Sequence, residues 1–224
     1  KIELKAACDG VFLVDSARLV AVNSQDEVMI ATRKGGTAVR EGDKLAGMRV
    51  IPLIIEEEKL QKAEQAAGDK PLLSLKPYVR KTACIVATGG EVKKGLIKDT
   101  FTPVVIDKLK TYGIETLEVV YSGDGVENVR DAVLAMREKK PDMILCTGGM
   151  SVDPDDLTPT AIRNLGAEIV THGVPAQPGN MTLVAYLGEV AILGVPGAAI
   201  SLPTTILDVL LPQVFTGDKL TREE

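Results

Sequence analysis

The sequence predicts an α/β protein with a three-layer α/β/α arrangement and a mostly parallel sheet, preceded by a small β-rich domain. From Thr82 onward, short apolar runs ending in glycine turns alternate with amphipathic stretches of helix formers. This alternation is typical of a parallel, doubly wound sheet. Residues 1–55 lack it and hold β-branched runs separated by Gly, Asn and Asp turns, which predict a small antiparallel sheet or barrel.

Three parts of the chain follow from these patterns. Residues 1–55 are the β-rich domain, residues 56–80 a helix and linker, and residues 81–217 the α/β domain. Glu56–Gly68 is rich in helix formers and ends on glycine, which predicts a short helix. The two prolines that follow favour an interdomain linker. Three basic residues are interpreted as a solvated face of this linker: Lys76, Arg80 and Lys81.

The first half of the α/β domain is predicted as two strand–helix pairs. The apolar run "TACIVATGG" from Thr82 has the composition and length of a buried strand. The stretch 99–113 places its apolar residues on one helical face, with Asp99 as the cap and Gly113 as the stop. A second strand follows in "IETLEVVYSGDG", and residues 126–140 repeat the helical pattern.

The second half begins with a third strand, "DMILCTGG", and ends with a helix. The helix after that strand is predicted to have Thr158 as N-cap and Pro159 at its first position. A strand and an excursion are expected over 167–180. Residues 181–197 then predict a hairpin, and residues 198–215 a final helix that breaks near Pro203.

Composition argues against several classes of function. Aromatic residues make up 3%, Trp is absent and the net charge is −5, which count against nucleic-acid partners. No run reaches the length of a membrane span and no signal peptide is seen, so we expect a cytoplasmic protein without membrane partners. The single histidine, His172, is expected in a loop rather than as a catalyst. The cysteines lack metal-ligand spacing and are expected to act as small buried hydrophobes: Cys8, Cys84 and Cys146.

Four glycine-containing turns end the predicted strands: residues 88–91, 122–125, 147–150 and 195–197. Ligands of such sheets bind outside the carboxyl ends of the strands, so we expect these turns to share one edge. Glycine lets a ligand approach the backbone closely, and backbone N–H groups bind anions. Neither standard nucleotide fingerprint is present, so the pattern favours a phosphorylated ligand without naming it.

An acidic stretch follows the third strand, at Asp153, Asp155 and Asp156. The spacing does not fit a calcium loop, because Leu157 and Thr158 stand where a ligand and a glycine are needed. The acids are interpreted either as favourable charges at a helix start or as one half of a site. In the second interpretation, one carboxylate joins Asp124 to hold Mg²⁺ against ligand phosphates.

The motifs resemble those of a known family. "TGGMSVDPDDLTP" is similar to the signature of the molybdopterin-binding domain of molybdenum cofactor biosynthesis proteins, and "ATGGEVKKGLIKDT" to its first strand, turn and helix. "YSGDG", "PAQPGNM" and "LGVPGAAIS" resemble its remaining turns. The resemblance covers about residues 81–215 and leaves the N-terminal region unassigned.

The resemblance implies a domain that binds molybdopterin or its adenylylated form. It implies a transferase of the adenylyltransferase or molybdenum-insertase kind, with Mg²⁺ and, in adenylylating members, ATP, working as a homo-oligomer, a dimer or a trimer. Asp124 and Asp156 fall on its two functional aspartates and would be both catalytic and metal-binding residues. The cofactor-binding residues that it implies are Thr88, Gly89, Gly90, Glu91, Thr147, Gly148, Gly149, Ser151, Pro196 and Gly197.

The chain departs from this family at several positions, which keeps alternatives open. Met150-Ser151 resembles the insertases more than the adenylylating members, and Asn180 replaces a phosphate-binding lysine. Asp153 stands where insertases have glycine. A non-catalytic carrier or sensor of the cofactor is one alternative, and a hydrolase of nucleotides such as ADP-ribose is another.

Overall fold

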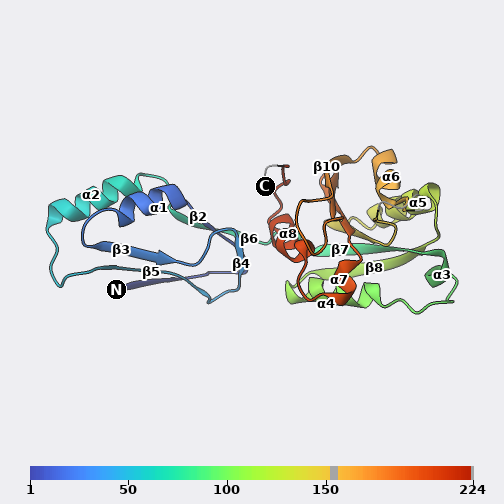
Figure 1. The fold of residues 1–224 in the computed structure, drawn as a ribbon, viewed down its shortest axis with the longest axis horizontal. Helices are drawn as coiled ribbons and strands as arrows, with labels where there is room; N and C mark the ends of the chain where they lie inside the picture. The colour runs from blue at the N-terminus through green and yellow to red at the C-terminus, as the bar shows by residue number, and fades with distance from the viewer. Residues whose placement is uncertain (152–155, 223–224) are drawn as a thin grey trace. The chain divides into compact units, whose positions relative to one another are not determined.

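The computed structural model of the chain describes residues 1–151 and 156–222. These residues form two compact units, Lys1–Tyr78 and Val79–Glu224, and Figure 1 shows the elements of each.

The first unit contains two three-stranded antiparallel sheets. Phe12, Val39 and Leu45 form a small core, against which Leu73 and Leu75 pack. One sheet has the order β1–β5–β3, with β1 at Ile2–Lys5, β3 at Val28–Thr32 and β5 at Lys44–Val50. The other has the order β4–β2–β6, with β2 at Gly10–Val14, β4 at Thr37–Val39 and β6 at Leu73–Pro77.

Two expectations for this unit were wrong in detail. Residues 1–55 are not composed of strands alone, because α1 spans Ser16–Asn23. The segment expected to be a linker contains β6, which pairs with β2 along its whole length. Alternating apolar residues of β6 reach the core, which explains why it pairs rather than remains extended in solvent. The short helix before it is confirmed as α2, Glu57–Ala67, followed by Gly68 at a φ of 66°.

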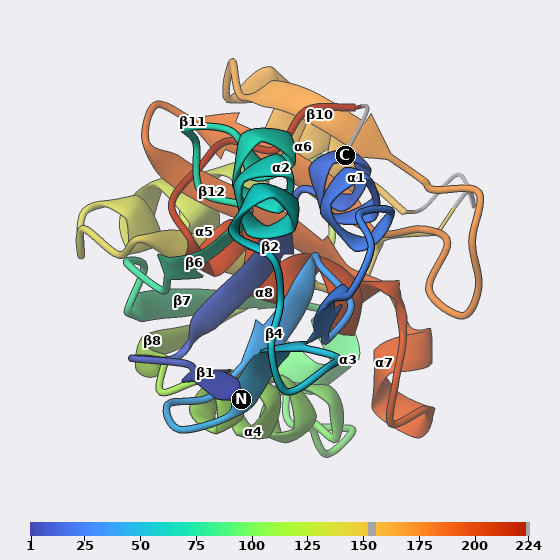
Figure 2. The same ribbon diagram turned by 90° about the vertical axis from the view of Figure 1, so that its left-hand side faces the viewer.

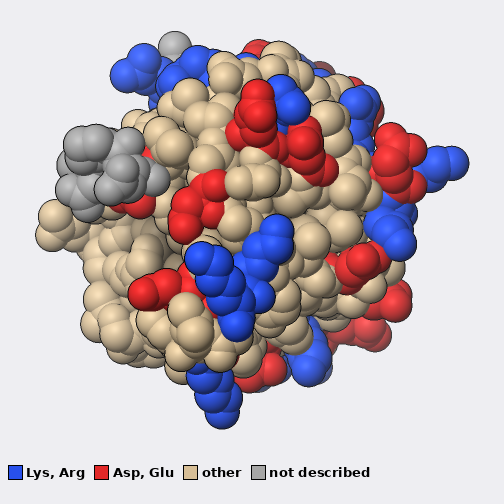
Figure 3. All heavy atoms as spheres, turned by 90° about the vertical axis from the view of Figure 1, so that its right-hand side faces the viewer, with Lys and Arg blue, Asp and Glu red and all other residues tan. Residues whose placement is uncertain are grey.

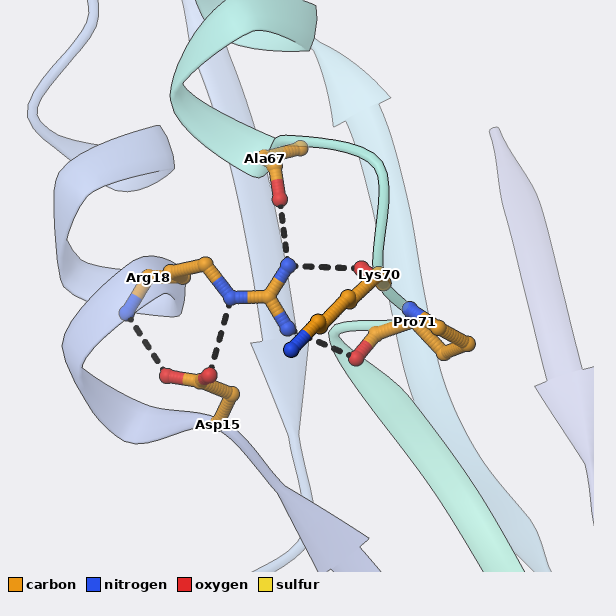
Figure 4. A network of polar contacts seen from close by, with 5 residues as sticks. All are labelled: Asp15, Arg18, Ala67, Lys70 and Pro71. Atoms are coloured by element: carbon orange, nitrogen blue, oxygen red, sulfur yellow. Dashed lines mark hydrogen bonds and ion pairs between the residues drawn. The ribbon is translucent and has the colours of Figure 1, made fainter.

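Arg18 connects α1 to the segment that follows α2 (Figure 4). Its guanidinium donates to the Asp15 carboxylate at 2.8 Å and to the carbonyl oxygens of Ala67, Lys70 and Pro71. The same carboxylate accepts the Arg18 backbone N–H and caps α1. These hydrogen bonds hold the pKa of Asp15 below its ordinary value, the backbone bond most of all. An N-cap residue and a crosslinking arginine, three positions apart, therefore explain the helix that the strand pattern concealed.

The second unit is built on a six-stranded sheet of order β10–β11–β12–β9–β7–β8. The strands β12, β9, β7 and β8 are parallel, and β10 and β11 extend the sheet in antiparallel fashion. The parallel strands span Thr82–Thr88 (β7), Glu115–Ser122 (β8), Met143–Thr147 (β9) and Val190–Val195 (β12). The other two span Glu168–His172 (β10) and Leu183–Leu187 (β11). The mostly parallel sheet and the hairpin are as the sequence predicts.

Helices cover both faces of this sheet, with α5 and α6 on one side and α4 and α7 on the other (Figures 1 and 2). Val133 of α5 and Ile162 of α6 pack against Cys84, Ile144 and Ile192 in one fully buried cluster. The helices are α3 (Gly90–Lys93), α4 (Phe101–Thr111), α5 (Val126–Arg137), α6 (Thr158–Asn164), α7 (Ala198–Ser201) and α8 (Ile206–Phe215). The predicted break near Pro203 is confirmed, because it lies between α7 and α8.

The cysteines behave largely as expected. Cys84 and Cys146 are buried and Cys8 is partly buried, and all three are free thiols. Burial raises the pKa of Cys146 to about 12, so its thiol stays protonated at physiological pH. Among the described residues, no helix is both long enough and apolar enough to cross a bilayer.

Arg80 is a correction to the interpretation of the basic trio as a solvated face. Its side chain is 6% exposed and lies at the end of the second unit where the parallel strands begin. The guanidinium donates to the carbonyl oxygens of Asp142 at 3.0 Å and Glu189 at 2.7 Å, and also to those of Val214 and Gly217. Arg80 therefore satisfies carbonyl groups from three segments that are remote in the sequence.

Asp142 lies beside this arginine and orders the start of β7. Its carboxylate accepts hydrogen bonds from the backbone N–H groups of Lys81 and Thr82 and from the Thr82 hydroxyl, at 2.7 to 2.9 Å. Partial burial acts to raise the pKa of Asp142, but these hydrogen bonds outweigh it and hold the pKa below its ordinary value. The stabilisation is therefore complete above the unfolded pKa and is lost as pH falls through the folded pKa.

We accordingly expect Asp142→Asn to lower the free energy of unfolding of the second unit by about 1 to 3 kcal/mol at pH 7. The difference from the wild type should shrink as pH falls below about 4, because the wild-type carboxylate is then protonated as well. Urea titrations followed through the amide signals of β7 at pH 7, 4 and 2 measure it. A difference that stays constant over this range would contradict the role given to the charge.

Candidate functional site

The carboxyl ends of the parallel strands form one edge, at which the predicted glycine turns meet. In the sheet register, Thr88 of β7 pairs with Ser122 of β8, and Thr147 of β9 pairs with both Ala87 and Val195. Within the sheet, β8 is the neighbour of β7 on one side, and β9, the next strand along the chain, is its neighbour on the other side. The point between β7 and β9 is therefore the topological switch point, where such sheets bind their ligands.

The two Thr-Gly-Gly turns contact each other at this point. The Thr88 hydroxyl donates to the carbonyl oxygen of Thr147 at 2.8 Å. Gly148 has a φ of 81°, and a methyl group built on it would lie 2.5 Å from the Thr88 hydroxyl oxygen and 2.6 Å from the Thr88 carbonyl oxygen. Only glycine fits here, since both its backbone conformation and the space exclude a side chain. The turns are thus held in contact by their own residues.

Thr158, at the start of α6, holds the second turn through two hydrogen bonds. Its hydroxyl donates to the carbonyl oxygen of Gly148 at 2.9 Å, and its backbone N–H donates to that of Gly149. The expectation that Thr158 caps α6 was wrong, because it is the first residue of the helix and Leu157 is the cap. Its hydroxyl is used by the glycine turn instead, and Pro159 follows inside the first turn of the helix.

Asp124 reaches the first turn from β8. Both oxygens of its carboxylate accept the backbone N–H of Gly90, at 3.1 and 3.0 Å. A methyl group built on Gly90 would lie 2.4 Å from one of these oxygens, so a side chain here would displace the Asp124 carboxylate. Asn128 donates to the carbonyl oxygen of Asp124 at 2.6 Å and fixes the turn before α5. The exposed carboxylate of Asp124 therefore lies at the edge where the glycine turns meet.

Two cavities open along this edge, and Asp156 and Gly149 line both of them. The first cavity, of about 380 Å³, also has Asp124 in its wall and is lined further by Thr88, Gly89, Gly125, Val129, Leu157 and Thr158. The second, of about 330 Å³, is lined further by Phe101, Gly148, Met150, Ser151, Gly179, Asn180, Met181, Val195, Pro196, Gly197 and Ala198. Asp156 therefore stands where the two cavities adjoin.

The structure brings together most of the residues that the sequence predicts for the site. Thr147 and Gly90 do not line a cavity, and they contribute a carbonyl oxygen and an N–H group to the turns instead. Glu91 is exposed in α3 and lines neither cavity. Asp153 and Asp155 lie outside the described residues. The predicted site residues that do line a cavity are Thr88, Gly89, Asp124, Gly148, Gly149, Ser151, Asp156, Pro196 and Gly197.

The residues predicted for the site did not include Phe101, Asn180 and Met181, which supply part of the second cavity, although Asn180 was noted as standing in place of a phosphate-binding lysine. Phe101 is the first residue of α4, and its cap position is Thr100 rather than the expected Asp99, although the Asp99 carboxylate accepts the N–H groups of Phe101 and Thr102. The Tyr121 hydroxyl also donates to Asp99, at 3.1 Å. Partial burial acts to raise the pKa of Asp99, but the bonds from Thr102, Phe101 and Tyr121 hold it below its ordinary value.

The expectation that His172 lies in a loop was wrong, because it is the last residue of β10. Its Nε2 atom is 3.5 Å from the carbonyl oxygen of Met150, and it lines neither cavity. No bond from it to Asp124 or Asp156 is found among the described residues.

The charges in the walls of the two cavities are those of Asp124 and Asp156 alone, among the described residues. Within residues 1–151 and 156–222, no group of three or more His, Cys, Asp or Glu side chains is arranged to hold a metal by itself. Mg²⁺ needs fewer protein ligands, since it binds one or two carboxylates and completes its shell with phosphate and water oxygens. Two carboxylates on one open cavity fit that requirement, and Gly90 occupies only part of the acceptor capacity of Asp124.

Comparison with known proteins places this α/β domain in a family. Residues 84–216, more than half of the chain, match the family described as "Probable molybdopterin binding domain". The chain belongs to this family. The match covers the six-stranded sheet and all the turns of the edge, and it leaves out the first unit.

Relatives of the molybdopterin-binding family agree with this assignment. A molybdopterin molybdenumtransferase from Synechococcus elongatus is 24% identical over 212 residues, which cover 89% of this chain and 50% of that protein. The corresponding protein from Bacillus subtilis is 30% identical over 131 residues, covering 54% of this chain and 30% of its own length. The chain thus spans at most half the length of these two relatives.

A solved structure of similar fold is the tungsten cofactor synthesizing protein MoaB from Pyrococcus furiosus. It is 19% identical, covers 61% of this chain and 94% of its own, and has a TM-score of 0.50. At this identity the likeness concerns the α/β fold alone.

Proposed function

We propose that the second unit binds molybdopterin, or its adenylylated form, at the edge where the two Thr-Gly-Gly turns meet, and takes part in molybdenum cofactor biosynthesis. The observation that carries the proposal is the pair of adjoining cavities, which Asp156 and Gly149 share and which contain Asp124. Backbone N–H groups at glycine turns suit a phosphate, and a cavity lined by Phe101, Met150 and Met181 suits the flat faces of a heterocyclic ring.

In this proposal, Asp124 and Asp156 hold Mg²⁺ together with phosphate oxygens of the ligand, and the metal supplies neutralising charge when bound. The Thr88 hydroxyl holds the two turns together through its bond to the carbonyl oxygen of Thr147, and the Thr158 hydroxyl holds the second turn against the start of α6. The walls of the cavities fix the orientation of the ligand. Catalysis would then rest on positioning and on charge stabilisation, as group transfers at phosphorylated ligands generally do.

Molybdenum transfer is the step that we favour over adenylylation. The two relatives that cover most of the chain are molybdenumtransferases by name. Met150 and Ser151 line the second cavity and stand where adenylylating members carry Thr-Gly, so the wall of this cavity differs from theirs. A non-catalytic carrier of the cofactor remains the second candidate, since neither cavity wall contains a cation among the described residues.

The test is to incubate the purified chain with Mg²⁺ and adenylylated molybdopterin plus molybdate, and in parallel with molybdopterin plus Mg-ATP. Mass spectrometry then identifies the products. Molybdenum transfer predicts a metallated cofactor in the first reaction, and adenylylation predicts an adenylylated product in the second. Tight binding with no product in either reaction would favour the carrier, and no binding at all would overturn the proposal.

A further inference from the structure

Among the described residues, the walls of the two cavities contain no cation, although the proposed ligand carries a phosphate. Asp124 and Asp156 together have the charge that one Mg²⁺ balances, which leaves the charge of the phosphate itself without a counter-charge. Position 180, in the second cavity, is Asn. An anion binds poorly beside two carboxylates unless positive side chains reach it as well.

Two lysines stand at the end of α3, a helix that is attached to the site. The N–H of Gly90, the first residue of α3, donates to both carboxylate oxygens of Asp124, so the helix and the acid are positioned together. Lys93 is in the last turn of α3, and its stem passes over the turn before Asp124. A methyl group built on Gly123 would lie 3.9 Å from Cδ of Lys93. Lys94 follows directly at the C-cap.

Both lysines are uncommitted within the part of the chain that the structure describes. Lys93 and Lys94 are exposed, and no ion pair or side-chain hydrogen bond of either is found there. Some other lysines of the second unit are paired, for example Lys108 with Asp208 and Lys139 with Glu118. On the end of this unit that carries α3, basic side chains lie next to acidic ones beside a hollow in the surface (Figure 3).

We infer that Lys93 and Lys94 bind the phosphate group of the ligand at the first cavity and supply the positive charge that the cavity walls lack. The inference rests on the proposed function and adds two residues to the site. The long, flexible stem of lysine allows its ammonium group to reach an anion above the Asp124 turn without a rigid fork. Asp124 then has a second role, since its bond to Gly90 positions the helix from which the lysines extend.

The experiment measures binding of molybdopterin in the presence of Mg²⁺ by titration calorimetry, with the full chain. Lys93→Met and Lys94→Met keep the stems and remove the charges. Each is expected to weaken binding about tenfold, and the double variant more, since a hydrogen bond to a charged group contributes on that scale. Affinity for the double variant should also depend less on salt. Lys110→Met is the matched control, because Lys110 is an exposed lysine in the last turn of α4 and lines neither cavity.

Inorganic pyrophosphate with Mg²⁺ is the second probe, followed through amide chemical shifts of the Asp124 turn. If the double variant binds molybdopterin within twofold of the wild type, the inference is wrong and the proposed function stands. If the wild type binds pyrophosphate but not molybdopterin, the proposed function fails, and loss of pyrophosphate binding in the double variant still supports the role of the lysines. If the wild type binds neither probe, both fail.

Discussion

Asp156→Asn is expected to lower the rate of the Mg²⁺-dependent transfer by about 100- to 1,000-fold, the range found when one preorganised charged or polar group is removed from a catalytic site. Asp156 lines both cavities, so its carboxylate faces the ligand whichever cavity holds the phosphate. Asparagine preserves the shape and one oxygen but removes the charge that binds Mg²⁺. Single-turnover assays with product detection by mass spectrometry measure the effect.

The matched control is Asp131→Asn. Asp131 is an exposed acid on α5 whose carboxylate bonds to Arg130, and it lines neither cavity. The rate of Mg²⁺-dependent transfer by the Asp131→Asn variant should stay within twofold of the wild-type rate. If Asp156→Asn behaved like this control while the protein remained folded, the two-carboxylate site would be wrong, and Asp156 would be a charge near the start of α6 and no more.

Arg80→Met is expected to destabilise the second unit by about 3 to 5 kcal/mol. The loss would remove the donors of four carbonyl oxygens, on Asp142, Glu189, Val214 and Gly217, at a position where the arginine is 6% exposed. Methionine replaces most of the volume, so the effect reports the hydrogen bonds rather than a cavity. Urea titrations followed through amide signals of β7 and β12 separate this unit from the first.

Lys81→Met provides the comparison, because Lys81 is the exposed neighbour of Arg80 in the chain. It should change the free energy of unfolding by less than about 0.5 kcal/mol. Equal effects of the two substitutions would show that Arg80 is a surface cation after all, as its place in the sequence first indicated.

The binding edge was predictable because its signals are local. A glycine turn at the end of each apolar run identifies a strand end, and the rule for parallel sheets then brings the ends together. This reasoning placed Asp124 and the acidic stretch at one edge, and the family resemblance singled out Asp156; the structure has Asp124 and Asp156 in the wall of one cavity. Whether they bind a metal stays a prediction.

Features that depend on contacts between remote segments could not be predicted in the same way. In the sequence, Arg80 looks like a linker cation, because the carbonyl groups that it satisfies lie more than 60 residues away along the chain. Only the folded sheet brings them next to it. The hydroxyl of Thr158 has a local alternative, capping its own helix, and the structure uses it for Gly148 instead. The β-branched residues of α1 made it look like a strand. The sequence did contain a signal for the helix, because Asp15 stands three positions before Arg18, the spacing at which an N-cap carboxylate accepts a backbone N–H group.

The central claim is that the ligand site is the edge between β7 and β9. Amide chemical shifts of the full chain, recorded during a titration with molybdopterin and Mg²⁺, test it most directly. We predict that the largest and saturable shifts fall on Gly89, Gly90, Gly148 and Gly149, and that Asp156→Asn reduces them. Saturable shifts confined to other parts of the sheet or to the first unit, with these glycines unchanged, would contradict the claim.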